Sequence, residues 1–119
     1  MTKILLVDDS GFSRRMIKNT LGEGYSYIEA ASGEAGLDLF IDSNPDLVIL
    51  DLTMPGMNGL EVLERIKEID PSARVIIGSA DIQEYNRLRA LELGALGFVN
   101  KPFQDSLVTL VRTVLFEGQ

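Results

Sequence analysis

Three short and almost wholly apolar runs constrain the fold of this chain more than any other feature. They are Lys3-Ile4-Leu5-Leu6-Val7, Leu47-Val48-Ile49-Leu50 and Arg74-Val75-Ile76-Ile77-Gly78. Each has the length of a strand, and their branched aliphatic residues favour extended backbone. Apolar runs without alternation are typical of strands buried on both faces, as in parallel sheets. The sequence therefore predicts a parallel sheet with helices on both sides.

Segments with helical periodicity separate these runs. Ser10 is a suitable N-cap and Gly22 a suitable stop for the first helix, and the pairs Asn58 with Glu61 and Asp81 with Glu84 have capping-box spacing. We expect helices over 12–21, 32–40, 58–69, 82–93 and 107–115, and two further strands over 25–30 and 96–99. Five strands alternating with five helices predict an α/β fold, a doubly wound five-stranded parallel sheet of the flavodoxin-like kind. The strand order expected for this fold is 2-1-3-4-5.

Composition limits the class of protein and the chemistry. The 119 residues predict one domain spanning 1–119, with no membrane span and no signal peptide, so we expect a cytoplasmic protein. A net charge of −7 disfavours nucleic acid as a partner, because binding phosphates requires clustered Lys and Arg. The chain has no His and no Cys, so any bound metal should be a hard cation held by oxygen atoms.

Polar residues follow four of the predicted strands at the point where each strand ends. Asp8 and Asp9 follow the first strand, Asp51 the third, Ser79 the fourth and Lys101 the fifth. Taken singly, each has an ordinary structural explanation: a turn cap for Asp51 or Ser79, and a solvated charge for the others. In open α/β sheets, however, binding sites form outside the carboxyl ends of the strands. The shared position therefore predicts one site built from all five.

The charges of these residues suggest what such a site does. Three carboxylates gathered at one crevice repel one another by a few kcal/mol per pair, to order of magnitude, so a cation must offset them. Lys101 supplies an ammonium, and Mg²⁺ is the divalent cation that best fits oxygen ligands. Acids, a lysine and a hydroxyl suit the transfer of a phosphoryl group to a carboxylate. Asp51 is the expected acceptor.

Four motifs together resemble the receiver domain of two-component response regulators, of the stand-alone chemotaxis type. They are the acidic pair Asp8-Asp9, the pattern D-x-x-M-P-x-M-x-G from Asp51 to Gly59, Ser79-Ala80, and Lys101-Pro102-Phe103. The resemblance covers essentially the full length. It implies a phosphoacceptor signalling domain rather than an enzyme, with a histidine kinase as partner, a phosphatase and a downstream protein as further partners, and a monomer or weak dimer.

The resemblance also assigns roles to individual residues. It implies that Asp51 receives the phosphoryl group and that Asp9, Asp51 and the Thr53 carbonyl ligate Mg²⁺, with Asp8 helping through water. Ser79 and Lys101 would hold the phosphoryl oxygens, assisted by backbone N–H groups near Thr53 and Ala80. Phe98 matches the family's switch aromatic, which turns inward when the Ser79 hydroxyl moves. The Lys101-Pro102 bond would be cis.

Several positions depart from the commonest family pattern. Ser79 stands where Thr is frequent, and Gly78 replaces a bulky apolar residue, which we expect to loosen the end of the fourth strand. Thr53 and Asp81 occupy positions that tune dephosphorylation in the family. An acidic Asp81 either orients or repels the attacking water, and the sequence leaves both open.

Two other classes fit parts of the sequence. Asp51-x-Thr53 is similar to phosphatases of the haloacid dehalogenase type, but these require a second acid where Thr53 stands, and a cap domain. A flavodoxin-like cofactor carrier would need a Ser/Thr/Gly-rich phosphate loop after the first strand, where Asp8-Asp9 would instead repel phosphate. A P-loop is excluded because the motif G-x-x-x-x-G-K-[ST] is absent.

Overall fold

The computed structural model describes residues 1–80 and 83–117. Within them, strands and helices alternate as predicted. The elements are β1 (Lys3–Val7), α1 (Gly11–Leu21), β2 (Ser26–Ala30), α2 (Gly33–Ser43), β3 (Leu47–Leu50), α3 (Gly59–Ile69), β4 (Val75–Ser79), α4 (Glu84–Glu92), β5 (Phe98–Asn100), α5 (Asp105–Arg112) and the π-helical segment η1 (Thr113–Glu117). All strand pairs are parallel, and the sheet order is β2-β1-β3-β4-β5. The predicted fold class and strand order are confirmed.

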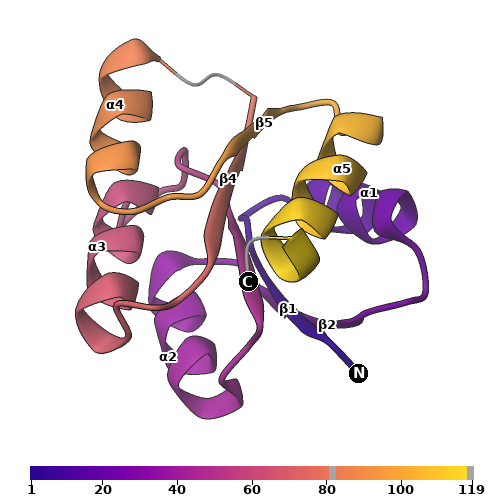
Figure 1. The fold of residues 1–119 in the computed structure, drawn as a ribbon. Helices are drawn as coiled ribbons and strands as arrows, with labels where there is room; N and C mark the ends of the chain where they lie inside the picture. Colours follow the sequence, from indigo (N-terminus) through magenta and orange to yellow (C-terminus); the bar gives the residue numbers. More distant parts are fainter. Residues whose placement is uncertain (81–82, 118–119) are drawn as a thin grey trace.

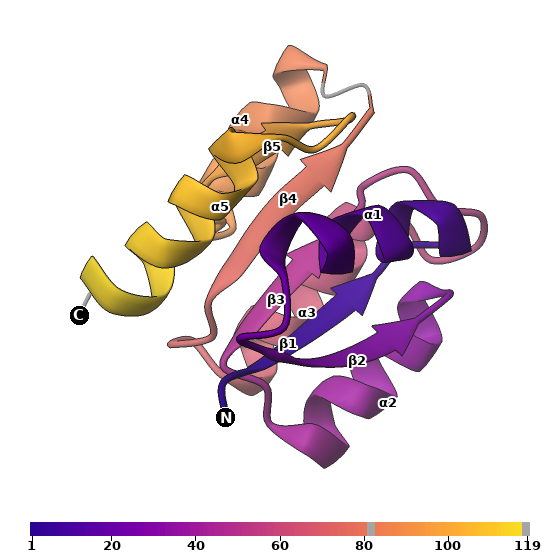
Figure 2. The same ribbon diagram turned by 90° about the vertical axis from the view of Figure 1, so that its right-hand side faces the viewer.

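Helices cover both faces of the sheet (Figures 1 and 2). α2, α3 and α4 lie on one face, whereas α1 and α5 lie on the other. Because alternate residues of a strand point to opposite faces, each face has its own apolar core. Leu5, Val7 and Leu50 belong to the core under α2 and α3, and Ile4 and Leu6 to the core under α1 and α5. The central strands are therefore buried on both sides, which explains their unbroken apolar sequence.

The strand register brings the predicted site residues together. Val7 pairs with Leu50 across β1 and β3, so Asp8 and Asp51, the next residues, leave the sheet side by side. Ser79, the last residue of β4, pairs with Asn100, and Lys101 follows. All these residues emerge at the carboxyl edge of the sheet, as expected for a site in this fold.

Three helix starts follow the predicted capping chemistry. The Ser10 and Ser32 hydroxyls accept hydrogen bonds from the Ser13 and Ala35 N–H groups. The Asn58 side chain likewise accepts from the Glu61 N–H at 3.0 Å. The predicted pair Asp81 with Glu84 begins outside the described residues, which start again at Gln83, a residue that makes no side-chain capping bond to α4.

Some element boundaries differ from those expected. α2 continues past Phe40 to Ser43 and ends at Asn44, whose left-handed φ of 48° provides the stop. β5 runs from Phe98 to Asn100 instead of 96–99. The last predicted helix divides, because the α-helix ends at Arg112 and the backbone continues as η1. Shifts of a few residues are usual at element ends, because the ends of helices and strands fray.

The end of β4 at Gly78, which we expected to be loosened, is closely packed. A Cβ atom built on Gly78 would lie 2.9 Å from Cε1 of Phe103, whose ring is buried against the sheet. The expectation of a loosened strand was wrong, because the Phe103 ring fills the space. The Lys101-Pro102 bond before this ring is cis, as the resemblance implied. None of the described helices has the length and apolar character that a membrane crossing requires.

Candidate functional site

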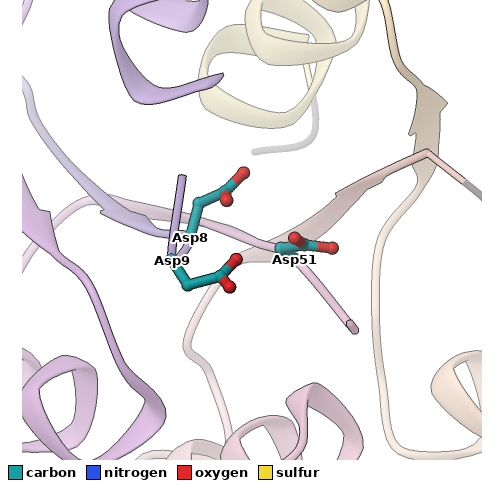
Figure 3. A group of neighbouring side chains, drawn as sticks. All are labelled: Asp8, Asp9 and Asp51. Atoms are coloured by element: carbon teal, nitrogen blue, oxygen red, sulfur yellow. The ribbon is translucent and has the colours of Figure 1, made fainter. Parts of the chain in front are cut away.

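The three predicted carboxylates converge at the carboxyl edge of the sheet. Figure 3 shows Asp8 and Asp9, directly after β1, beside Asp51, directly after β3. One oxygen atom from each residue lies within 4.8 Å of the others. Asp8 and Asp51 are buried, whereas Asp9 is exposed. The group therefore forms an acidic pocket that is open to solvent at Asp9.

Lys101 faces two of these acids. Its Nζ atom lies 2.9 Å from Oδ2 of Asp8 and 3.3 Å from Oδ2 of Asp51. Burial alone would lower the pKa of the lysine, but the neighbouring Asp8 and Asp51 together raise it above its usual value. Lys101 is therefore held as a cation. One ammonium offsets only part of the charge of three carboxylates.

Asp8 is the most constrained of the three acids. Its Oδ1 accepts a hydrogen bond from the Ser10 N–H at 2.9 Å. Its Oδ2 is buried and forms an ion pair with Nζ of Lys101 at 2.9 Å. Burial raises the pKa of this carboxyl group above its ordinary value, although the Lys101 ammonium and the Ser10 N–H oppose the change. Asp8 shares the Lys101 ammonium with Asp51, so the three carboxylates keep an excess of negative charge that a cation with oxygen ligands would offset.

Asp51 is held by the fourth strand and by the loop that follows it. Its Oδ1 accepts hydrogen bonds from the Ser79 hydroxyl at 2.8 Å and from the Thr53 N–H at 3.1 Å. Ser79 is fully buried at the end of β4. The hydroxyl predicted to face Asp51 thus touches it directly.

The structure brings together Asp8, Asp9, Asp51, Ser79, Lys101 and the Thr53 N–H. Ala80 follows Ser79 at the same edge, but no hydrogen bond of its backbone to the site is present in the described part of the chain. Phe98 lies on the edge strand β5, half-buried against the core under α2 and α3. Asp81 lies outside the described residues.

Sequence reasoning missed the function of Gly59. Gly56 in the same loop serves the usual purpose of a glycine, because its φ is positive at 79°. Gly59 instead begins α3, where a Cβ atom would clash with the Asp51 carbonyl oxygen and the Leu52 Cα. It permits the helix to start directly against the backbone of the acidic residue. The sequence signal that could have shown this is the position of Gly59 as the last residue of the motif D-x-x-M-P-x-M-x-G.

The family comparison agrees with this geometry. The response regulator receiver domain family matches the chain over residues 4–112. The chain belongs to this family. It is 39% identical over 108 residues to the chemotaxis protein CheY of Thermotoga maritima, covering 89% of this chain and 90% of that protein. It is 43% identical to sporulation initiation phosphotransferase F of Bacillus subtilis, covering 85% of this chain and 82% of the relative.

A solved structure supports the same assignment. The complex of CheX and CheY with BeF3 and Mg²⁺ from Borrelia burgdorferi matches with a TM-score of 0.87 and 36% identity, covering 95% of this chain and 88% of that chain. This chain is thus a receiver domain of two-component response regulators with a phosphoacceptor signalling function, and the haloacid dehalogenase alternative is not supported. Receiver domains typically bind Mg²⁺ at an acidic pocket, and this chain has such a pocket. In that solved structure, CheY is in complex with CheX.

Proposed function

We propose that Asp51 accepts a phosphoryl group from the phosphohistidine of a histidine kinase, and that the transfer switches a protein-binding surface. The observation that carries the proposal is the convergence of Asp8, Asp9 and Asp51 opposite Lys101. Of the three acids, Asp51 alone accepts hydrogen bonds from both a hydroxyl and a loop N–H. These donors orient one of its oxygen atoms and leave the other beside the lysine.

The acidic pocket fits Mg²⁺. Three carboxylates facing one ammonium leave an excess of negative charge, and two of them, Asp8 and Asp51, are buried. Asp9, Asp51 and the Thr53 carbonyl would hold the ion, and Asp8 would reach it through water. When bound, the ion neutralises charge on the phosphoryl oxygens.

The proposed transfer forms one bond and breaks one. An Asp51 carboxylate oxygen attacks phosphorus, the P–N bond to the donor imidazole breaks, and the imidazole nitrogen keeps the electron pair. Lys101 and the Ser79 hydroxyl, which contact Asp51 before transfer, then bind phosphoryl oxygens instead. The N–H groups of Thr53 and Ala80 complete this set of donors. These donors would stabilise the negative charge of the phosphoryl oxygens and thereby the phosphorylated state.

Switching would follow from the movement of Ser79. Ser79 is the last residue of β4 and pairs with β5, two residues beyond the partner of Phe98. We propose that Ser79 contact with the phosphoryl group stabilises an inward state of the half-buried Phe98 and remodels the surface of β4, α4, β5 and α5. The chain would act in the cytoplasm by binding partner proteins, a phosphatase among them, and would not turn over small phosphate esters.

Intact mass spectrometry tests the acceptor. The protein is incubated with Mg²⁺ and a small phosphodonor, in parallel with Asp51→Asn and with Asp42→Asn, whose exposed carboxyl group lies at the end of α2. The wild type and Asp42→Asn should gain the mass of one phosphoryl group, and Asp51→Asn should gain none. Equal labelling of Asp51→Asn would refute the acceptor. Unchanged amide shifts on α4 and β5 with a phosphoryl mimic would refute the switch.

A further inference from the structure

The Arg14 side chain folds back from α1 over the acidic loop, which consists of Asp8, Asp9 and Ser10 between β1 and α1. Its Nη1 donates a hydrogen bond to the backbone carbonyl of Asp8, and its Nε donates to Oε1 of Glu29 on β2 at 2.9 Å. Nη2 lies near Gly11: a Cβ atom built on that glycine would be 3.5 Å from Nη2. The side chain is only 18% exposed, and the two hydrogen bonds hold the guanidinium group in place. A planar guanidinium suits such a fork of two acceptors.

The carbonyl that Arg14 holds belongs to the peptide between Asp8 and Asp9. Because a peptide unit is planar, fixing its carbonyl also fixes the positions of the Asp9 N and Cα atoms, from which the side chain leaves the strand. Asp8 has other restraints, since its side chain bonds to the Ser10 N–H and faces Lys101. No hydrogen bond to the Asp9 carboxylate occurs among residues 1–80 and 83–117. The position of Asp9 therefore depends on its backbone.

We infer that Arg14 is a positioning residue for the metal site: it clamps the Asp8-Asp9 peptide so that the Asp9 carboxylate faces Asp51. The inference rests on the proposed magnesium site and assigns to it a residue that is not a ligand. Glu29 orients the guanidinium group from the opposite side. Residues that orient metal ligands typically change metal affinity by tenfold or more when they are removed, to order of magnitude.

The sign of the effect separates positioning from simple charge. Arg14 is a cation close to an acidic pocket, so as a charge alone it would repel Mg²⁺, and its removal would strengthen binding. As a clamp it aligns a ligand, and its removal would weaken binding. The conservative change Arg14→Lys keeps the charge but cannot span both acceptors in the same plane. Positioning therefore predicts weaker binding in both Arg14→Gln and Arg14→Lys.

Lys18 provides a matched control on the same helix. It lies one turn further along α1, and its Nζ is 2.9 Å from Oε2 of Glu29, the second oxygen of the carboxylate that Arg14 contacts. Within the described residues, the Lys18 side chain makes no hydrogen bond to the acidic loop. Lys18→Gln removes one positive charge and one ion pair with Glu29, as Arg14→Gln does, but leaves the Asp8 carbonyl bond intact.

Mg²⁺ titration by calorimetry, with amide NMR shifts of Asp9 and Ser10, tests the inference without any phosphorylation. Arg14→Gln and Arg14→Lys should each bind Mg²⁺ about tenfold more weakly than the wild type, whereas Lys18→Gln should bind as tightly or slightly more tightly. If Arg14→Gln does not fold, Arg14→Lys carries the same test. Affinity at or above the wild-type value in the folded Arg14 variants would overturn the inference and leave the magnesium site standing. A wild type that binds no Mg²⁺ would overturn both.

Discussion

α3 and α4 occupy equivalent places in the fold but are held very differently. Each follows a strand that ends in a site residue, Asp51 after β3 and Ser79 in β4. α3 buries Val62, Leu63 and Ile66 completely and is capped by Asn58. In the described part of α4 only Ala90 is buried, and Tyr85, Leu88 and Leu91 are exposed.

The two helices beside the site therefore differ in how firmly they are anchored: α3 is held by its core contacts, whereas α4 can move more easily. Segments with few buried contacts open at lower free energy than those anchored in a core. A side-chain link between the two helices is the ion pair of Arg89 with Glu64 at 3.5 Å, and an exposed pair of this kind contributes at most about 1 kcal/mol. The proposed acceptor Asp51 thus lies beside the more firmly anchored helix. Any rearrangement that follows phosphorylation costs least on the α4 side.

The sharpest test of the comparison makes the same substitution in both helices. Leu63 is completely buried in the core between α3 and the sheet, whereas Leu88 of α4 is 47% exposed. Leu63→Ala should lower the free energy of unfolding by about 3 kcal/mol, because it removes buried methyl groups and leaves a cavity. Leu88→Ala should change it by no more than about 0.5 kcal/mol. Urea unfolding monitored by circular dichroism measures both.

A comparable loss of stability in the two leucine variants would show that α4 is anchored as firmly as α3. The proposed difference in anchoring between the two helices would then be wrong. A normal Leu63→Ala value together with a small Leu88→Ala value supports it. Equal slopes of unfolding free energy against urea are needed for the two values to be compared.

The second test concerns the junction of α3 with the acceptor. A Cβ atom at Gly59 would meet the backbone of Asp51 and Leu52, which cannot yield as a flexible side chain does. Gly59→Ala should cost about 2 kcal/mol and should also slow phosphorylation, because it displaces Asp51. Gly24→Ala is the matched control, since no atom lies within 4 Å of its Cβ and its φ is not positive. It should be nearly neutral in thermal unfolding and in phosphorylation.

A Gly59→Ala protein that unfolds and accepts phosphoryl groups as the Gly24→Ala protein does would show that α3 can shift at its start. The close packing of α3 against Asp51 would then have no functional weight. Slower phosphorylation with unchanged stability would instead separate the position of Asp51 from the stability of the fold.

The sequence predicted the fold and the site where its signals were local, such as unbroken apolar runs, helical periodicity and capping residues. Apolar runs defined β1 and β3, Ser10 and Asn58 marked helix starts, and the residues at the strand ends followed once parallel pairing was assumed. The ends of β5 were predicted less well, although Gly97 and Pro102 flank the strand.

What the sequence could not show depended on contacts between distant segments. The ring of Phe103 fills the space above Gly78, although the two residues are far apart in the chain. Arg14 was missed for the same reason, because its bonds to the Asp8 carbonyl and to Glu29 join α1, the acidic loop and β2. A basic residue on a helix after an acidic pair carries no pattern of its own. Only the folded arrangement gives it a partner.

The smallest expected difference between α3 and α4 concerns their first residues. The Asn58 side chain accepts the Glu61 N–H, whereas Gln83 makes no such bond to α4. Asn58→Ala should therefore lower the free energy of unfolding by about 1 kcal/mol, and Gln83→Ala should leave it within a few tenths, on the order of 0.3 kcal/mol. Chemical denaturation of both variants provides the measurement. If Gln83→Ala costs as much as Asn58→Ala, α4 has an N-terminal restraint equal to that of α3. In that case the low cost of moving α4 must come from its exposed apolar face alone.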